Sequence, residues 1–357
     1  MRNIVAAFAL LVVVGCGKKD DAVAKDGASP HAAFAGRTLH VFVWNGYLVP
    51  ELVKDFEKET GAKVVEANFD DNEGMRAKLL AGGSGYDLCC PSDYMVPQLV
   101  KDGVLETIDL AHVPNVKNLS PRFAAPDYDG KHEHSVPYQW GLTGIAYRKS
   151  AVKSPPKSWK EFFDASNVAA WKGRISMLDD GRELAAAALL ALGKSPNSRD
   201  EKEIAAARDL LVAQKASVAK YDSSSFGEAL VAKETVIAQG WSGDIAKAQA
   251  EDADIAFVVP AEGTLSYTDN WAIPKGAPEK ALAEAFIDYL LRPDVAAAAA
   301  NAHRYASTNE AAKAKILPEI LNGTSYEDGR GKKLYRIEDV GPAAEAYARL
   351  KADLKTE

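Results

Sequence analysis

Residues 38–66 read TLHVFVWNGYLVPELVKDFEKETGAKVVE, and this stretch decides the fold. Thr38 to Trp44 is rich in β-branched and aromatic residues, which predicts a buried strand. Pro50 then opens a helix with one apolar face that ends at Gly61, and Lys63 to Glu66 returns to strand composition. A strand, a helix and a strand in this order are typical of an α/β unit with parallel strands.

The same alternation continues along the chain. Further helices are expected at Met75 to Leu80, Glu183 to Leu192, Glu201 to Val212 and Glu279 to Leu291, and further strands at Tyr86 to Cys90, Thr235 to Gln239, Asp254 to Val259 and Trp271 to Pro274. The part from Arg37 to Glu357 is too long for one ordinary domain, and 47% hydrophobic residues suffice for two cores. We therefore expect two lobes.

The N-terminus has the features of an exported lipoprotein. Arg2 precedes an apolar run from Ile4 to Val14, which is shorter than the roughly 20 residues that span a bilayer. The run ends in Val-Val-Gly-Cys16, which resembles the lipobox of bacterial lipoproteins. We expect residues 1–15 to be a signal peptide, Cys16 to carry the lipid anchor, and the polar, small residues 16–36 to form a tether on the periplasmic or cell-surface face of a membrane.

Charge and cysteine content narrow the possible partners. The formal net charge is −7, and removal of residues 1–15 takes away only Arg2, which makes it −8. This balance disfavours nucleic acid and permits cationic ligands. The two remaining cysteines, Cys89 and Cys90, are adjacent, and neighbouring cysteines seldom pair because the ring would be strained. No disulfide framework is expected.

Aromatic and acidic side chains recur together in the turns after the predicted strands. In open α/β sheets ligands collect at the carboxyl ends of strands, so these turns are the expected binding region. The relevant residues are Trp44, Tyr47, Ser92, Asp93, Tyr94, Asp179, Asp180, Glu183, Trp241, Tyr267, Asp269 and Asn270. Rings bind the methylenes and ammonium groups of a flexible polycation through cation–π contacts, and carboxylates pair with its charges, so the combination suits a polyamine. Any single member has an ordinary structural explanation, such as packing or a helix cap.

At these turns the chain resembles the spermidine/putrescine-binding proteins of bacterial polyamine ABC importers, from about Thr38 to Leu350. The likeness is carried by residues 44–50 (WNGYLVP), 56–61 (FEKETG), 86–88 (YDL) with 91–94 (PSDY), 136–141 (VPYQWG) and 290–296 (LLRPDVA). It implies a two-lobed periplasmic-binding-protein fold of type II, each lobe a mixed α/β sheet flanked by helices, joined by two crossing strands. Lobe 1 would comprise residues 37–143 plus about 264–304, and lobe 2 residues 144–263 plus about 305–357.

The resemblance also implies a binding site. An aromatic box would fall on Trp44, Tyr47, Tyr94, Trp241, Tyr267 and Tyr305, with Ser92 as a hydrogen-bonding neighbour and Asp180, Glu183 and Asp269 as carboxylate partners of ammonium groups. The expected protein is a non-enzymatic, monomeric receptor that captures putrescine or spermidine and delivers it to an ABC permease in the inner membrane. No cofactor and no metal are expected.

Three positions depart from the family's pattern. Gly46 stands where an acid often precedes the first tyrosine, and Asp93 is our candidate for the replacement charge. Tyr267 stands where a second tryptophan is usual, and a late glutamine aligns with Ile337. These differences make putrescine at least as plausible a ligand as spermidine.

Other interpretations stay open at the level of sequence. An amino-acid receptor would need a cation for the ligand's carboxylate, for which Arg182 is the candidate, and sugar and iron receptors share the same scaffold. Cys89 and Cys90 would serve a cysteine-dependent enzyme, although burial in a strand is the simpler reading. His132 and His134 could face one side of a strand as metal ligands, but no third ligand follows at a defined spacing.

Overall fold

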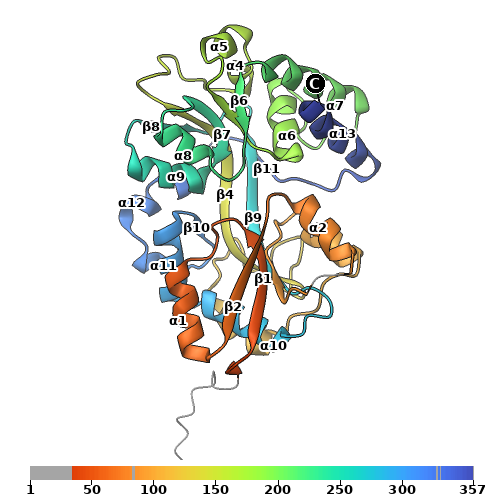
Figure 1. The fold of residues 1–357 in the computed structure, drawn as a ribbon, viewed down its shortest axis with the longest axis vertical. Helices are drawn as coiled ribbons and strands as arrows, with labels where there is room; N and C mark the ends of the chain where they lie inside the picture. The colour runs from red at the N-terminus through yellow and green to blue at the C-terminus, as the bar shows by residue number, and fades with distance from the viewer. Residues whose placement is uncertain (1–33, 83–84, 327–328, 330, 357) are drawn as a thin grey trace, which may run out of the picture.

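The computed structural model describes residues 34–82, 85–326, 329 and 331–356, and these residues form two lobes stacked along the long axis of the molecule (Figure 1). The expected signal peptide, Cys16 and most of the expected tether lie outside the described residues. Only Phe34, Ala35 and Gly36 of the tether are described, and Gly36 donates its backbone N–H to the Gly61 carbonyl, 3.1 Å away. The described chain therefore starts docked on the lower lobe of Figure 1.

The first lobe is built on the β-α-β unit that the sequence predicts. Its elements are β1 (Thr38–Trp44), α1 (Pro50–Thr60), β2 (Lys63–Phe69), α2 (Asn72–Leu80), β3 (Leu88–Cys89), α3 (Val96–Lys101), η2 (Leu110–His112), η3 (Pro114–Asn118), α10 (Lys280–Leu290), α11 (Pro293–His303) and β10 (Ala306–Ser307). β1 lies parallel to both β2 and β3. Pro50 occupies the first turn of α1, and Gly61 closes the helix with φ 72°.

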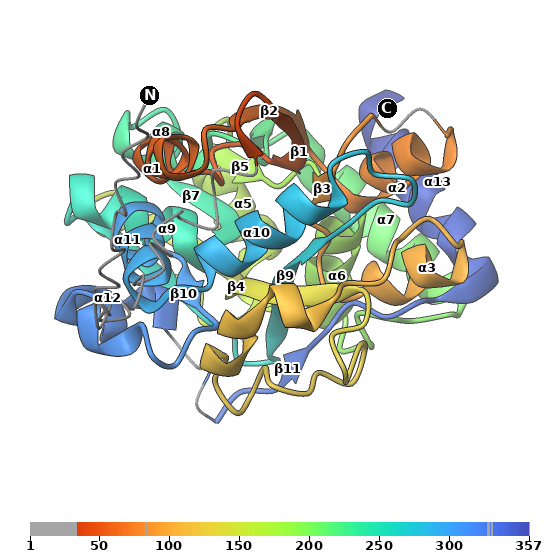
Figure 2. The same ribbon diagram turned by 90° about the horizontal axis from the view of Figure 1, so that it is seen from below.

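Helices cover this first sheet on both sides. Seen from below, α10 crosses the lower face, α1 and α11 lie to one side of it, and α2 and α3 lie to the other (Figure 2). Phe56 of α1 and Phe286 of α10 meet edge to face with ring centroids 4.8 Å apart, and both are fully buried. This buried aromatic pair packs the two helices against each other.

Two long strands connect the lobes. β4 (Ser135–Arg148) and β9 (Thr264–Ala272) pair antiparallel and run through the waist of the molecule (Figure 1). β4 begins beside β9 and β10 in the first lobe and ends beside β7 (Ile237–Trp241) and β8 (Ile255–Val258) in the second. The late strand also reaches β3, where Ala272 pairs with Cys89, so this part of the chain lies in the first lobe.

The second lobe repeats the α/β arrangement. Its further elements are α4 (Trp159–Phe162), α5 (Ala165–Ala170), β5 (Ile175–Met177), α6 (Gly181–Ala191), α7 (Glu201–Lys215), β6 (Val218–Tyr221), α8 (Phe226–Val231), α9 (Ser242–Glu251) and α13 (Ala344–Thr356). The sheet order is β4-β7-β5-β6, with β5 parallel to both neighbours. The mixed α/β fold expected for each lobe is therefore confirmed.

The chain after α11 departs from the expected division. The sequence placed residues from about 305 onward in the second lobe, but β10 pairs with Gln139 and Trp140 in the sheet of the first. Ile316 precedes α12 (Pro318–Leu321) and Ile320 lies in it. Both pack against alanines of α11. The backbone hydrogen bonds of β10 and this apolar packing hold the segment on the first lobe.

The rest of the C-terminal segment returns to the second lobe. Two short helices, η4 (Lys313–Lys315) and η5 (Thr324–Tyr326), come before the chain crosses to the second lobe. After the crossing come β11 (Leu334–Tyr335), η6 (Gly341–Ala343) and α13. β11 pairs with Thr264 and Leu265 at the start of β9, and α13 buries Tyr347 and Leu350 in the core of the second lobe. The last part of the chain thus runs along the junction between the lobes.

Candidate functional site

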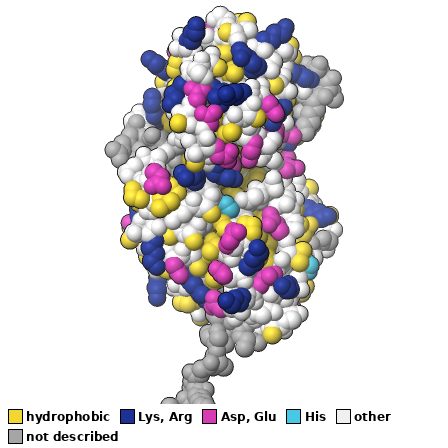
Figure 3. Space-filling view, turned by 60° about the vertical axis from the view of Figure 1, so that its left-hand side comes forward, with side chains coloured by type: hydrophobic (Ala, Val, Ile, Leu, Met, Phe, Trp, Pro, Cys, Tyr) yellow, Lys and Arg dark blue, Asp and Glu magenta, His cyan; other side chains and the backbone are white. Residues whose placement is uncertain are grey.

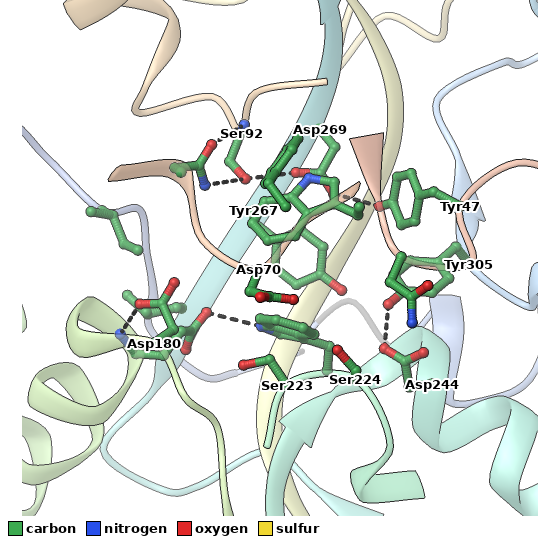
Figure 4. A pocket seen from close by; sticks show the side chains of 18 of the residues that line it. Tyr47, Asp70, Ser92, Asp180, Ser223, Ser224, Asp244, Tyr267, Asp269 and Tyr305 are labelled. Carbon is green, nitrogen blue, oxygen red and sulfur yellow. Dashed lines mark hydrogen bonds between the residues drawn. The ribbon is translucent and has the colours of Figure 1, made fainter. Parts of the chain in front are cut away.

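A cleft between the lobes gathers eleven of the residues expected from the sequence, whereas Asp179 and Asn270, which were named with them, do not line it. Its lining includes Trp44, Tyr47, Ser92, Asp93, Tyr94, Asp180, Glu183, Trp241, Tyr267, Asp269 and Tyr305. Figure 4 shows Asp180 on one side of this cleft, Tyr305 and Asp244 on the other, and Asp269 with Ser92 at one edge. The carboxyl ends of strands from both lobes meet here, as the turn argument predicted.

Two tryptophans face each other across the cleft. Trp44 ends β1 in the first lobe and Trp241 ends β7 in the second, and their rings meet edge to face with centroids 6.1 Å apart. Gly46 follows with φ 67°, a backbone conformation that favours glycine, and it brings Tyr47 back into the cleft. Contact between rings from opposite lobes shows that the structure is in a closed arrangement.

Asp269 is held at the first-lobe wall by two neutral donors. The Ser92 hydroxyl donates to Oδ1 at 2.7 Å, and the Tyr47 hydroxyl donates to Oδ2. Burial raises the pKa of Asp269 to about 6, and the two hydrogen bonds oppose that rise. Asn72 in turn donates to the Ser92 hydroxyl at 3.1 Å, which orients this donor. Asp269 is thus fixed in place and largely ionised at neutral pH.

Glu183 occupies the opposite wall at the start of α6. Its Oε1 accepts hydrogen bonds from Thr143 Oγ1 at 3.0 Å and from Trp241 Nε1 at 3.1 Å. The other oxygen, Oε2, is buried without a hydrogen-bond partner among the described residues. Burial, and next the negative charge of Asp180, raise the pKa of Glu183 to about 8. A cation in the cleft would stabilise the ionised form of this side chain.

Asp180 combines a structural role with its place in the cleft. It caps α6 by accepting the backbone N–H groups of Arg182 at 2.8 Å and Glu183 at 3.0 Å. Burial raises its pKa, and Lys351 is a nearby positive charge that opposes the rise. Its helix-cap explanation is therefore correct, and its position beside Glu183 adds negative charge to the same wall.

The tyrosines of the box depend on glycines in the opposite strand or helix. Tyr267 lies over Gly141, where a Cβ would meet the phenol oxygen at 2.4 Å. Tyr305 lies over Gly243 of α9, where a Cβ would meet the ring at 2.4 Å. Because Tyr305 belongs to the first-lobe part of the chain and Gly243 to the second lobe, the absence of a side chain at position 243 permits close approach of the lobes.

The three departures from the family's pattern all fall on the cleft. Gly46, Tyr267 and Ile337 line it, which supports the alignment of each. Asp93, the candidate for the missing charge, is buried with its Oδ2 unpartnered among the described residues. Burial raises the pKa of Asp93 to about 7, and the positive charge of Arg336 opposes the rise. Asp93 therefore supplies a carboxylate to the cleft, but one with a resident cation nearby.

Several lining residues were missed by the sequence analysis. Asp70 and Asn72 follow β2, Ser223 and Ser224 follow β6, and Asp244 and Lys247 lie on the first two turns of α9. The Tyr305 hydroxyl donates to Asp244 Oδ2, and burial raises the pKa of Asp244 to about 6. A usable signal existed for this pair, because Asp244 and Lys247 follow Trp241 at intervals of three residues.

Two ion pairs bridge the lobes beside the cleft. Lys351 Nζ of α13 lies 2.8 Å from Asp71 Oδ2, the residue that caps α2 in the first lobe, and also donates to the Asp179 carbonyl at 3.1 Å. Arg336 makes a bidentate pair with Asp127 of the first lobe. Figure 3 shows acidic and basic side chains side by side at the constriction between the lobes.

Arg182, the cation proposed for an amino-acid ligand, does not line the cleft. Its guanidinium lies 4.5 Å from the Tyr347 ring centroid and donates to the Glu338 carbonyl at 3.1 Å and to Asn197 Oδ1 at 3.0 Å. These contacts direct it into the second lobe and remove the main support for an amino-acid receptor.

The cysteines and histidines considered for catalysis or metal binding are occupied by packing or by contacts with backbone carbonyl groups. Cys89 and Cys90 are fully buried, and burial raises the pKa of both thiols. His132 is buried with Nε2 against the Ala124 carbonyl at 3.0 Å, and His134 Nδ1 lies 3.1 Å from the Glu106 carbonyl. No group of three metal-ligating side chains occurs among the residues that the structure describes.

Two α/β lobes, a pair of crossing strands and a ligand-sized cleft between them define a solute receptor. Comparison with known proteins gives the family: a profile described as bacterial extracellular solute-binding protein matches residues 51–321. The chain belongs to this family of bacterial extracellular solute-binding proteins. The prediction of a receptor rather than an enzyme is therefore confirmed.

Named relatives cover nearly the whole chain. It is 35% identical to the putrescine-binding periplasmic protein SpuD of Pseudomonas aeruginosa over 85% of this chain and 88% of that protein. It is 34% identical to the spermidine/putrescine-binding periplasmic protein of Escherichia coli over 99% of this chain and 98% of that protein. Among solved structures, the TpPotD lipoprotein of Treponema pallidum matches with a TM-score of 0.77 and 32% identity, covering 90% of this chain and all of that one. Within the described part of this chain, every helix is too short or too polar to cross a membrane.

Proposed function

We propose that this protein is the substrate-capturing component of a bacterial ABC importer and that it binds a polyamine in the cleft between its lobes. One observation carries the proposal. Asp269 and Glu183 face the cleft from opposite lobes, and the hydrogen bonds to both come from neutral donors. An ammonium group at each carboxylate would supply the missing positive charge.

The rings between these carboxylates suit the hydrocarbon part of such a ligand. Trp44 and Trp241 meet across the cleft, and the Tyr267 ring lies 6.4 Å from Trp241 with a tilt of 68°. Aromatic faces attract the methylenes and the ammonium ends of a polyamine, at roughly 0.5–2 kcal/mol for each cation–π contact. The polyamine names of the Pseudomonas and Escherichia relatives support the same ligand class.

The closed lobes would then be the form that the membrane permease recognises. Hinge motion about β4 and β9 opens the cleft, and the ligand favours closure because it contacts both walls. In this proposal lobe 1 consists of residues 37–143 with 264–304 and the β10 to α12 segment, and lobe 2 of the remainder. The receptor acts as a monomer, because both walls of its cleft come from one chain.

We further propose that Cys16 anchors the receptor to the membrane surface. The Val-Val-Gly-Cys16 sequence supports this, as does the description of the Treponema neighbour as a lipoprotein. The Cys16→Ala variant is expected to leave the membrane fraction and appear in the soluble fraction of fractionated cells. A Cys89→Ala variant is the matched control and should stay in the membrane fraction. Equal membrane association of both variants would contradict the anchor.

A thermal-shift panel tests the ligand class. The ligand-stripped protein would be heated with putrescine, spermidine, spermine, arginine, glutamate and glucose, because a ligand that binds only the folded state raises the melting temperature. We expect a rise with at least one polyamine and none with glutamate or glucose. A rise with an amino acid alone would overturn the proposal in favour of an amino-acid receptor.

A further inference from the structure

The cleft contains a positively charged side chain of its own. Among the described residues that line it, Lys247 is the basic one. It lies on α9, three residues after Asp244, so both side chains project from the same face of the helix into the cleft. The helix starts directly after Trp241, which places this pair at the end of the cleft where Tyr305 lies.

The groups around Lys247 locate its charge. Asp244 accepts a hydrogen bond from the hydroxyl of Tyr305, and the positive charge of Lys247 opposes the rise in the pKa of this carboxyl. On the first-lobe side, His303 stacks on Tyr47 with ring centroids 6.2 Å apart. Burial, and next the positive charge of Lys247, lower the pKa of His303 to about 4, so this histidine is neutral. Glu228 is a further acid near Asp244. The positive charge of Lys247 therefore acts on both Asp244 and His303.

The buried carboxylates of the cleft differ in the groups that surround them. Asp244, Asp180 and Asp93 each have a cation of the protein in electrostatic reach, which is Lys247, Lys351 and Arg336 respectively. Asp269 has only hydroxyl donors. Glu183 accepts hydrogen bonds from a hydroxyl and an indole, and the positive charge of Arg182 also acts on it, although that guanidinium lies on the Tyr347 ring outside the cleft. Asp269 and Glu183 face the cleft from opposite walls and accept side-chain hydrogen bonds from neutral groups, so we assign the positive charges of the ligand to these two carboxylates.

We infer that the cleft selects a diamine over a triamine, with Lys247 as the residue that determines this specificity. One ammonium group meets Asp269 and the other meets Glu183. A third ammonium group directed to the Asp244 end would meet Lys247, and repulsion between like charges in a partly buried site weakens binding. This inference rests on the proposed polyamine function and specifies its ligand.

The test compares putrescine and spermidine by isothermal titration calorimetry at fixed pH and salt. The variants are Lys247→Gln, which removes the charge, and Lys247→Arg, which retains it. The exposed Lys160 of α4 provides a matched control, Lys160→Gln. We expect wild type, Lys247→Arg and Lys160→Gln to prefer putrescine. In Lys247→Gln the ratio of spermidine to putrescine affinity should rise at least tenfold.

Asp244→Asn supplies a second variant that keeps the cation and removes its counter-charge. In Asp244→Asn the ratio of spermidine to putrescine affinity should fall below the wild-type ratio. A Lys247→Gln ratio within twofold of wild type, or a wild-type protein that prefers spermidine, would overturn the inference while leaving the polyamine function intact. A properly folded wild type that binds neither ligand would overturn the proposed function, and the inference with it.

Discussion

The two walls of the cleft carry equivalent groups in different electrostatic states. Each wall presents one tryptophan and one carboxylate with neutral donors: Trp44 and Asp269 in the first lobe, Trp241 and Glu183 in the second. Both oxygens of Asp269 accept hydrogen bonds, whereas Glu183 Oε2 has no partner among the described residues and Asp180 lies nearby. Asp269 is therefore prepared for a cation at neutral pH, and Glu183 ionises fully only when a cation arrives.

This difference suggests an order of events. A cationic ligand would first meet the preformed charge of the first lobe, and closure would then bring its second charge to Glu183. Ionising Glu183 reduces the net binding free energy when the pH is below the pKa of this group, so the second lobe is the pH-sensitive half of the site. Substitutions and changes of pH can distinguish the contributions of the two walls to binding.

The largest expected effect belongs to Asp269→Asn. The substitution keeps the shape of the side chain and removes the charge that two hydroxyls orient. Affinity for putrescine should fall more than tenfold, which is above about 1.4 kcal/mol, in isothermal titration calorimetry. The exposed Asp55→Asn on α1 is the control and should bind as wild type. Equal affinities for the two variants would show that Asp269 does not supply the negative charge that binds the ligand.

The next effect is a pH dependence that originates in Glu183. Its pKa is raised to about 8, so the ligand-free carboxyl is largely protonated below that pH, and a cation must displace the proton. Putrescine affinity should therefore rise roughly tenfold between pH 6.5 and 8.5. Glu183→Gln should bind more weakly and lose most of this rise. A Glu183→Gln profile parallel to wild type would assign the pH dependence to another group.

Closure itself is tested by Gly243→Ala. A Cβ at this position would meet the Tyr305 ring at 2.4 Å, so the lobes must stay slightly farther apart. We expect roughly fivefold weaker binding with an unchanged melting temperature of the ligand-free protein, together with a smaller change in tryptophan fluorescence on binding. Gly276→Ala at an outer turn is unsuitable as a control, because Gly276 has φ 76° and a side chain at this backbone conformation would be strained. Ala81→Gly, at the C-terminus of α2, leaves the cleft untouched and should bind normally.

The smallest effect concerns the stability of the ligand-free protein. The folded-state pKa values of Glu183 and Asp93, about 8 and about 7, exceed those of an unfolded chain. Their contribution to stability is therefore complete below about pH 4 and is lost as the pH rises through 7 to 8. The melting temperature should fall by a few degrees between pH 6 and pH 8.5, and less in Glu183→Gln. An equal fall in both proteins would exclude Glu183 as its source.

Sequence reasoning predicted best where local signals bound an element. Thr38–Trp44 and Pro50–Thr60 were placed to the residue or nearly so, because Pro50 and Gly61 fix the helix ends. β4 was not anticipated at its full length, since a strand buried in two lobes shows no polar alternation. The two-residue β10 carries no composition signal, and its pairing with β4 decides which lobe holds the segment.

For the site, the turns next to predicted strands and helices indicated ten of the eleven residues found in the cleft, and the family resemblance added Tyr305, but the charges around them depend on the fold. Asp244 and Lys247 were missed because α9 starts directly after β7 without a turn. Arg182 was assigned to the cleft by its position next to Glu183, yet successive helical residues point in different directions. The cations that act on Asp180 and Asp93, which are Lys351 and Arg336, come from segments far apart in sequence and follow only from the fold.

The most direct test of the account is the crystal structure of the protein with putrescine. We predict one ammonium nitrogen at about 2.8 Å from an Asp269 oxygen and the other at a similar distance from Glu183 Oε2, with the methylenes along the Trp241 ring. Putrescine bound outside the cleft, or bound inside it with both nitrogens away from Asp269 and Glu183, would contradict it.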